Sequence, residues 1–286
     1  MTGLATNQEQ LVQLAVQGRI SHPSQTGSYT VDQHDRPTML PGMSGVSVNL
    51  RVGDGAFSFA CDHGEAGVSA EGLAPAEHLA LQVLACLGNR VTMLSGDAKG
   101  AVGTVAGKHA FVLIDFPAVD LNRMAPGDQL LVRACGQGLV ITSCPQVAPR
   151  NCSPDLLQRL PLEIRPSGAL AVSVVGTLPP EVMGAGLGMS SEWANCDVML
   201  QSPETVDRLG LGGLRIGDLV AMEAQDHRFG RAYDPGWASI GVIVPALSPT
   251  PGHGVGVVTV LTGPKACFEI HQVPSCNLRE LLEMPQ

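Results

Sequence analysis

The sequence predicts a mainly β protein made of barrel-like domains with a few short helices, and it leaves an α+β arrangement open. Apolar stretches of strand length alternate with turns rich in glycine and proline, with 34 Gly and 21 Pro among 286 residues. Few stretches carry a helical signature. Many short strands between Gly/Pro turns are typical of β-barrels and β-sandwiches.

The length suggests two domains, at about 150 residues per domain. A proline-rich stretch at residues 151–166 is expected to be a linker. It separates an N-terminal barrel-like domain, residues 1–150, from a C-terminal β-rich domain, residues 167–286. A short helix is expected inside the linker at 154–160, because Ser153 is a good N-cap and Pro154 suits the first turn.

The N-terminal half is expected to contain strands and one helix. Alternating apolar residues predict a strand at 46–52. A Gly-Asp-Gly turn then leads the chain into residues 56–61. The helix is expected at 75–87, with Leu79, Val83, Cys86 and Leu87 on its buried face and Gly88 as its stop. Further strands are expected at 90–94, 111–116 and 129–134.

The C-terminal half is expected to be strand-rich as well. One helix is expected, at 203–209, after Ser202 and beginning with Pro203. Strands are expected at 170–175, 219–223, 238–244 and 255–261.

Composition excludes several classes of function. The net charge of −9 and scattered Lys and Arg residues argue against nucleic-acid binding. Apolar stretches are too short to cross a membrane, and the first ten residues do not resemble a signal peptide, so we expect a cytoplasmic protein. The eight cysteines form no C-x-x-C pair, and we expect reduced thiols. Because only 15% of residues are charged, we expect a homo-oligomer.

A weak internal repeat links the two halves. Gly53–Asp54 precedes Asp62–His63, and Gly217–Asp218 precedes Asp226–His227 at the same spacing. A third Gly-Asp pair, at 127–128, lacks the Asp-His that follows the other two. The repeat predicts that each half delivers an acid–imidazole pair to a strand end. The alternative is that a common turn recurs by coincidence.

The first candidate site is the run from Cys61 to Glu65. Asp62, His63 and Glu65 offer carboxylate and imidazole groups, which suit a divalent metal such as Zn, Mn or Fe. His253, between two glycines, is a further candidate ligand beside Asp62 and His63. Without a metal, the same groups suit acid–base catalysis. The alternative is an Asp–His hydrogen bond that only stabilises a turn.

Candidate substrate-binding residues lie elsewhere in the chain. Arg228 and Arg231, next to the catalytic candidate His227, can clamp a carboxylate, or can belong to a salt-bridged surface loop. Lys99 and Gly186 are weaker candidates, since Lys99 stands near Asp97 and Gly186 lies in a Gly-rich run. That run and the Gly103–Lys108 segment do not match nucleotide-binding motifs, so no nucleotide cofactor is indicated.

Several longer strings carry a family resemblance: HPSQTGSY, SGDAKG with GKHA, VMGAGLG, LRIGDLVA with DHRFGR, IGVIV and PGHGVGV. From about His22 to Gly263 the chain resembles a bacterial and archaeal family described only as a domain of unknown function, with N-terminal and C-terminal β-rich domains. The resemblance implies this fold and a cytoplasmic setting, but no activity. The chain departs from the family pattern at Cys61, where an acidic or polar residue is expected, and at Pro245, where a His is expected.

These observations favour a small-molecule enzyme with its site between the two halves. Its expected reaction is hydrolysis of a C–N bond in a small amide, linear or cyclic, with or without the help of a metal. One alternative is a non-catalytic binding protein for a small anionic metabolite. Another is a proton-transfer isomerase or lyase that uses His63 opposite Asp97 and Lys99.

Overall fold

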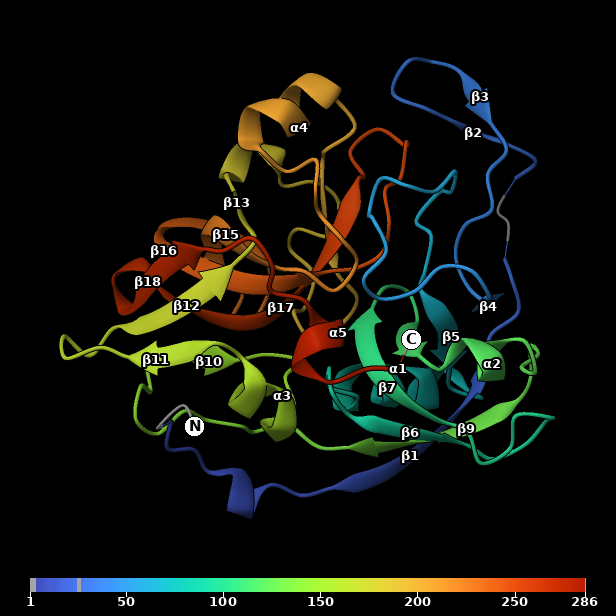
Figure 1. Cartoon of the computed structure of the whole chain (residues 1–286), viewed down its shortest axis with the longest axis horizontal. Coiled ribbons are helices and arrows are strands. Elements are labelled where there is room, and N and C mark those ends of the chain that lie inside the picture. Colours follow the sequence, from blue (N-terminus) through green and yellow to red (C-terminus); the bar gives the residue numbers. More distant parts are fainter. Residues whose placement is uncertain (1–3, 25–26, 286) are drawn as a thin grey trace.

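Two β-rich halves lie side by side in a computed structural model that describes residues 4–24 and 27–285 (Figure 1). The N-terminal half is the blue-to-green part and the C-terminal half the yellow-to-red part of Figure 1. The fold is therefore mostly β with short helices, as expected.

The N-terminal half is a closed barrel of antiparallel strands. Its strands follow the order β1-β9-β6-β7-β8-β5, and β5 pairs back onto β1 to close the ring. The short strand β4 adds to β5. Apolar side chains such as Ile20, Val68 and Val105 fill the interior. The bounds are β1 Leu14–Ile20, β4 Val46–Ser47, β5 Gly67–Glu71, β6 Arg90–Met93, β7 Val102–Lys108, β8 Val112–Asp115 and β9 Gln129–Ala134.

Helix α1 (Pro75–Leu84) packs against β1, but not with the face that the sequence predicted. The helix ends at Leu84, because Ala85 has an extended backbone. Leu81 is fully buried and packs over Gly18, whereas Leu79 is 53% exposed. The predicted buried face was therefore wrong at Leu79. A second short helix, α2 (Ala118–Leu121), follows β8.

The C-terminal half contains two sheets. The larger has the order β10-β17-β16-β15-β13, and β14 pairs with β17. The smaller has the order β11-β12-β18. The bounds are β10 Ala148–Pro149, β11 Leu162–Ile164, β12 Leu170–Val174, β13 Gly176–Leu178, β14 Cys196–Val198, β15 Leu219–Asp226, β16 Ala232–Ile243, β17 Val255–Pro264 and β18 Phe268–Gln272. Two helices belong to this half, α4 (Pro203–Leu209) and α5 (Leu278–Leu281).

The segment expected as a linker is buried secondary structure. Residues 151–166 contain helix α3 (Pro154–Arg159) and strand β11. The Ser153 hydroxyl oxygen accepts a hydrogen bond from the Leu156 amide and caps α3, as its sequence predicted. Leu156 and Leu157 are fully buried in a core that both halves share. This stretch therefore joins the halves rather than separating them.

The repeated Gly-Asp turns are part of that junction. Gly53 and Gly217 both have positive φ, at 97° and 92°, which favours glycine. In each turn the aspartate side chain accepts a hydrogen bond from the backbone amide three residues earlier, Asp54 from Arg51 and Asp218 from Arg215. The two turns also bond to each other, because the Gly53 amide donates to the Ile216 carbonyl at 2.7 Å.

The predicted strand at 46–52 is much shorter than expected. Only 46–47 pair as β4, and residues 48–66 form a long loop. Before it, the strands β2 (Thr30–Val31) and β3 (Pro37–Thr38) form an arm that projects beside the barrel (Figure 1). Within the described residues, no helix has the length and apolar character needed to span a membrane.

Candidate functional site

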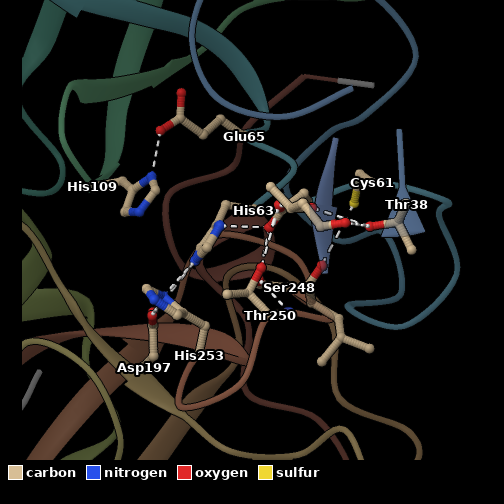
Figure 2. A network of polar contacts seen from close by, with 12 residues as sticks. Thr38, Cys61, His63, Glu65, His109, Asp197, Ser248, Thr250 and His253 are labelled. Atoms are coloured by element: carbon tan, nitrogen blue, oxygen red, sulfur yellow. Dashed lines mark hydrogen bonds and ion pairs between the residues drawn. The ribbon is translucent and has the colours of Figure 1, made fainter. Parts of the chain in front are cut away.

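Three segments from distant parts of the chain meet where the two halves face each other. The loop at 48–66 brings Asp62, His63 and Glu65, strand β14 brings Asp197, and the loop between β16 and β17 brings His253 (Figure 2). Two backbone bonds join the loops, since the Ala246 amide donates to the Gly64 carbonyl and the Leu247 amide to the Ala56 carbonyl, both at 2.9 Å. The site therefore belongs to neither half alone.

The centre of the site is a triad of His63, Asp197 and His253. His63 Nε2 lies 3.0 Å from His253 Nδ1, and Asp197 Oδ2 lies 2.8 Å from His253 Nδ1 and 3.5 Å from His63 Nε2. Ligand atoms around a tetrahedral zinc, each about 2.0–2.2 Å from the ion, are about 3.3–3.5 Å apart. The three atoms are thus grouped closely enough to hold one metal ion after small adjustments.

Asp62 supports this triad from behind His63. Its Oδ1 atom lies 2.8 Å from His63 Nδ1 and accepts a second hydrogen bond from the Ser248 hydroxyl at 2.6 Å. The hydrogen bond from His63 is the main reason why the pKa of Asp62 falls to about 2. Because a carboxylate only accepts, the network assigns the proton to His63 Nδ1 and turns Nε2 toward the triad. A carboxylate behind a histidine is the arrangement that orients metal-bound imidazoles.

The charges of the site favour a cation at its centre. Burial lowers the pKa of His63, but hydrogen bonds with Asp197 and Asp62 outweigh it and raise the pKa to about 9. Burial raises the pKa of Asp197, but hydrogen bonds from His253 and His63 bring it down to about 2. Among the described residues, no lysine or arginine forms an ion pair with Asp62, Glu65 or Asp197. A proton on His63, or a metal ion in its place, supplies the positive charge that these carboxylates attract.

The site is closed at its base and open on one side. Asp197 and His63 are buried, while the His253 side chain is 36% exposed. A small pocket adjoins Asp62 and His63, walled by Thr30, Leu40 and Met43 of the segment that carries the β2–β3 arm. A metal held by three protein ligands with an open side matches the pattern of catalytic rather than structural zinc sites.

Glu65 and His109 form a second polar pair beside the triad. Glu65 Oε1 lies 2.7 Å from His109 Nδ1, and the His109 ring stacks on the His63 ring at 5.0 Å between centroids (Figure 2). His109 directly follows β7, and Glu65 lies two residues before β5. Both residues therefore lie close to the ends of barrel strands.

The sequence predicted two of the three triad residues. His63 and His253 come together, but Asp62 supports His63 instead of reaching the triad itself. Asp197 was not predicted, because it lies in the apolar run NCDVML. A lone buried aspartate in such a strand is the signal that could have indicated it, since buried carboxylates need a partner.

His227 does not join the other histidines. It is fully buried, and its ring nitrogens face the Thr259 hydroxyl at 2.6 Å and the Gln225 side chain at 3.2 Å. Burial, with a contribution from Arg231, lowers its pKa to about 3, so this imidazole is neutral. His227, a catalytic candidate from the sequence, is therefore not part of the site that contains His63 and His253. The Asp-His parts of the repeat have different surroundings.

The predicted substrate-binding residues also lie or form their contacts outside this site. Arg228 pairs with Asp226 and lies over the Trp237 ring. Arg231 is 1% exposed and donates to the carbonyls of residues 186, 193 and 194, so no solute reaches it. Gly186 lies in that same turn, with φ of 93°. Lys99 is exposed in the turn between β6 and β7. The expected carboxylate clamp is therefore not part of this site, and neither are Asp97 and Lys99, which were expected to act as the acid opposite His63.

Comparison with known proteins agrees with this two-part architecture. Residues 29–158 match the domain of unknown function DUF4438, N-terminal, and residues 159–282 match its C-terminal counterpart. A solved structure titled "Crystal structure of TM1086" is 36% identical and superposes with a TM-score of 0.93, covering 97% of this chain and 98% of that one. A search of curated proteins finds no match.

Proposed function

The chain belongs to the DUF4438 family, and from the site between its two domains we propose that it is a metal-assisted hydrolase that cleaves the C–N bond of a small amide. The observation that carries this proposal is the grouping of His63 Nε2, His253 Nδ1 and Asp197 Oδ2 within 3.5 Å of one another. Two imidazoles and a carboxylate suit Zn, Mn or Fe, and the first is the simplest choice for hydrolysis.

In this proposal the metal ion binds a water molecule on the open side of the triad. A bound ion would lower the pKa of such a water to about 7, so that the water could give up a proton near neutral pH. The oxygen of this water would bond to the carbonyl carbon of the amide as the water loses its proton, and the C–N bond would then break. The leaving nitrogen takes up a proton, and the products are a carboxylic acid and an amine.

The charges around the triad favour a neutral substrate. Asp62, Glu65 and Asp197 are acidic, and the arginines once expected to clamp a carboxylate have other partners. Apart from the proposed ion or the proton on His63, no lysine or arginine among the described residues pairs with these carboxylates, so little positive charge is left to attract an anionic substrate. This argues against the anionic-metabolite alternative and favours an uncharged amide, linear or cyclic.

Metal analysis of the purified full-length protein tests the proposal first. We expect one Zn, Mn or Fe ion per chain, lost in His63→Ala and His253→Ala but kept in His271→Ala, a histidine on β18 outside the site. The loaded protein is then assayed on a panel of linear amides, lactams, cyclic imides and ureides. A protein that binds no metal, or that cleaves none of these compounds when loaded, would contradict the proposal.

The cellular setting that we propose is the cytoplasm. The eight cysteine thiols are all unpaired, which fits a reducing compartment. We also propose a homo-oligomer, because apolar side chains such as Phe229 and Tyr233 are strongly exposed. Light scattering of the purified protein at several concentrations measures the oligomeric state.

A further inference from the structure

The Glu65–His109 pair lies against the triad but has no assigned part in holding a metal. The His109 ring is nearly parallel to the His63 ring, with 20° between the planes. His109 is not among the three residues whose ligand atoms converge. A histidine this close to the site, held by a carboxylate, calls for a function of its own.

Hydrogen bonding determines which nitrogen of the His109 ring carries a proton. Glu65 is 1% exposed, and its carboxylate accepts from the Ser44 amide and the Ser69 hydroxyl as well as from His109. Because the carboxylate only accepts, a His109 ring with one proton carries that proton on Nδ1. The lone pair then lies on Nε2, for which the described residues provide no hydrogen-bond partner.

The strand ends hold this pair in place. Strands β5, β8 and β7 are neighbours in the barrel, so the segments that carry Glu65 and His109 share one rigid sheet. Lys108, which precedes His109, is fully buried and donates to the Asn151 side chain at 2.7 Å and to the Glu192 carbonyl at 3.0 Å. The His109 side chain retains 13% exposure, so the ring is not completely enclosed.

We propose that His109 is the proton-transfer residue of the site and that Glu65 positions it. This inference rests on the proposed amide hydrolysis. His109 Nε2 takes a proton from the metal-bound water, whose O–H bond breaks as its oxygen bonds to the carbonyl carbon. The same Nε2–H then gives that proton to the leaving nitrogen as the C–N bond breaks. The ring returns to its neutral state, and no oxidant or further reactant is needed.

Chemical modification of the zinc-loaded protein tests the assignment without a substrate. Diethyl pyrocarbonate reacts with the free lone pair of imidazole, and peptide mass spectrometry measures the rate at each histidine. We expect His109 to react with and without zinc, while zinc protects His253. Protection of His109 by zinc would make it a ligand, and no reaction in either form would mean that Nε2 is not free. Either result overturns the proposal.

The variant Glu65→Gln tests the positioning role. A glutamine side chain can donate to His109 Nδ1, which moves the ring proton to Nε2. We therefore expect at least a tenfold slower modification of His109 in this variant, and ¹⁵N NMR shifts that report the other tautomer. An unchanged tautomer would contradict the role of Glu65.

Turnover of an amide found in the panel completes the test. We expect His109→Gln to keep one zinc ion per chain and a KM within about threefold, with kcat lower by about 10²–10⁴-fold. His271→Gln is the control and should match the wild type. An inactive wild-type protein would refute the proposed function, whereas an active wild type with an equally active His109→Gln would refute only the role of His109.

Discussion

Asp62 shows how one side chain can set the chemistry of another. Its bond to His63 Nδ1 leaves Nε2 as the nitrogen that faces Asp197 and His253. Without that bond, the imidazole ring is free to choose the other tautomer or to rotate. The metal affinity of the triad should therefore depend on a residue that is not itself a ligand.

We expect Asp62→Asn to weaken zinc binding by about 10–100-fold, because the neutral amide neither attracts the His63 N–H as strongly nor adds to the negative charge. Competition with a chromophoric zinc chelator measures the dissociation constant. Asp226→Asn is a matched control, since Asp226 pairs with Arg228 outside the site. Equal affinities in the two variants would show that Asp62 does not support the metal.

Because the His227 imidazole is buried, we expect the protein to lose stability in acid. Its pKa is about 3 in the folded protein, owing first to burial, and about 6.5 in an unfolded chain. The unfolded state therefore binds an additional proton between these values, and stability falls as the pH drops below 6.5. From pH 6.5 to 4.5, His227 should lower the free energy of unfolding by about 2 kcal/mol.

Urea unfolding of the wild type and of His227→Gln at several pH values measures this contribution. The variant is expected to be less stable at neutral pH, since it disturbs the bonds to Thr259 and Gln225. Only the difference in pH dependence is diagnostic. Parallel curves for the two proteins over this range would mean that His227 takes up its proton without cost.

At the scale of secondary structure, local signals predicted much of the fold. Helix α4 and strand β9 have the predicted bounds, since a serine cap and Pro203 mark the start of α4, and a Gly-Asp turn precedes β9. Strand β17 begins where expected but runs to Pro264. The alternation at 46–52 failed, because pairing partners are available only for residues 46 and 47.

The candidate site was harder to predict, because its ligands are separated by up to 190 residues. Local sequence indicates which residues are polar, but the pairing of β14 with β17 brings Asp197 beside His253. The same limit explains the error at His227, whose surroundings come from Thr259 on β17. The spacing that the two Asp-His pairs share does not indicate which pair lies at the site between the halves.

At position 67, the start of strand β5, the backbone conformation and the neighbouring strand leave room only for glycine. Gly67 starts β5 just after Glu65, with φ of +71°, and an added Cβ would lie 2.4 Å from the Ile114 carbonyl oxygen. Gly67→Ala should destabilise the protein by clearly more than the ~1 kcal/mol of backbone strain alone. Gly100→Ala is the control, because Gly100 has φ of +90° and open space around it. Similar unfolding free energies for both variants would contradict this steric explanation.

At the scale of the whole molecule, the two halves should unfold together. One core cluster includes residues of both, among them Leu113 of the barrel and Val258 of the larger C-terminal sheet. The linked Gly-Asp turns and the loop contacts add hydrogen bonds across the junction. Separating the halves would expose this core, so an intermediate with one folded half is unfavourable.

Thermal unfolding with two probes tests this expectation and the metal site together. Both tryptophans, Trp193 and Trp237, lie in the C-terminal half, so their fluorescence reports that half while far-UV circular dichroism reports the whole chain. We expect coincident transitions. Free zinc at 100 times its dissociation constant adds about 2.7 kcal/mol, which raises both midpoints by about 4–5 °C. His253→Ala should lose this shift, because it removes one ligand. A zinc shift in the fluorescence transition alone would mean that the ion stabilises only the C-terminal half, and would contradict a site shared by the two halves.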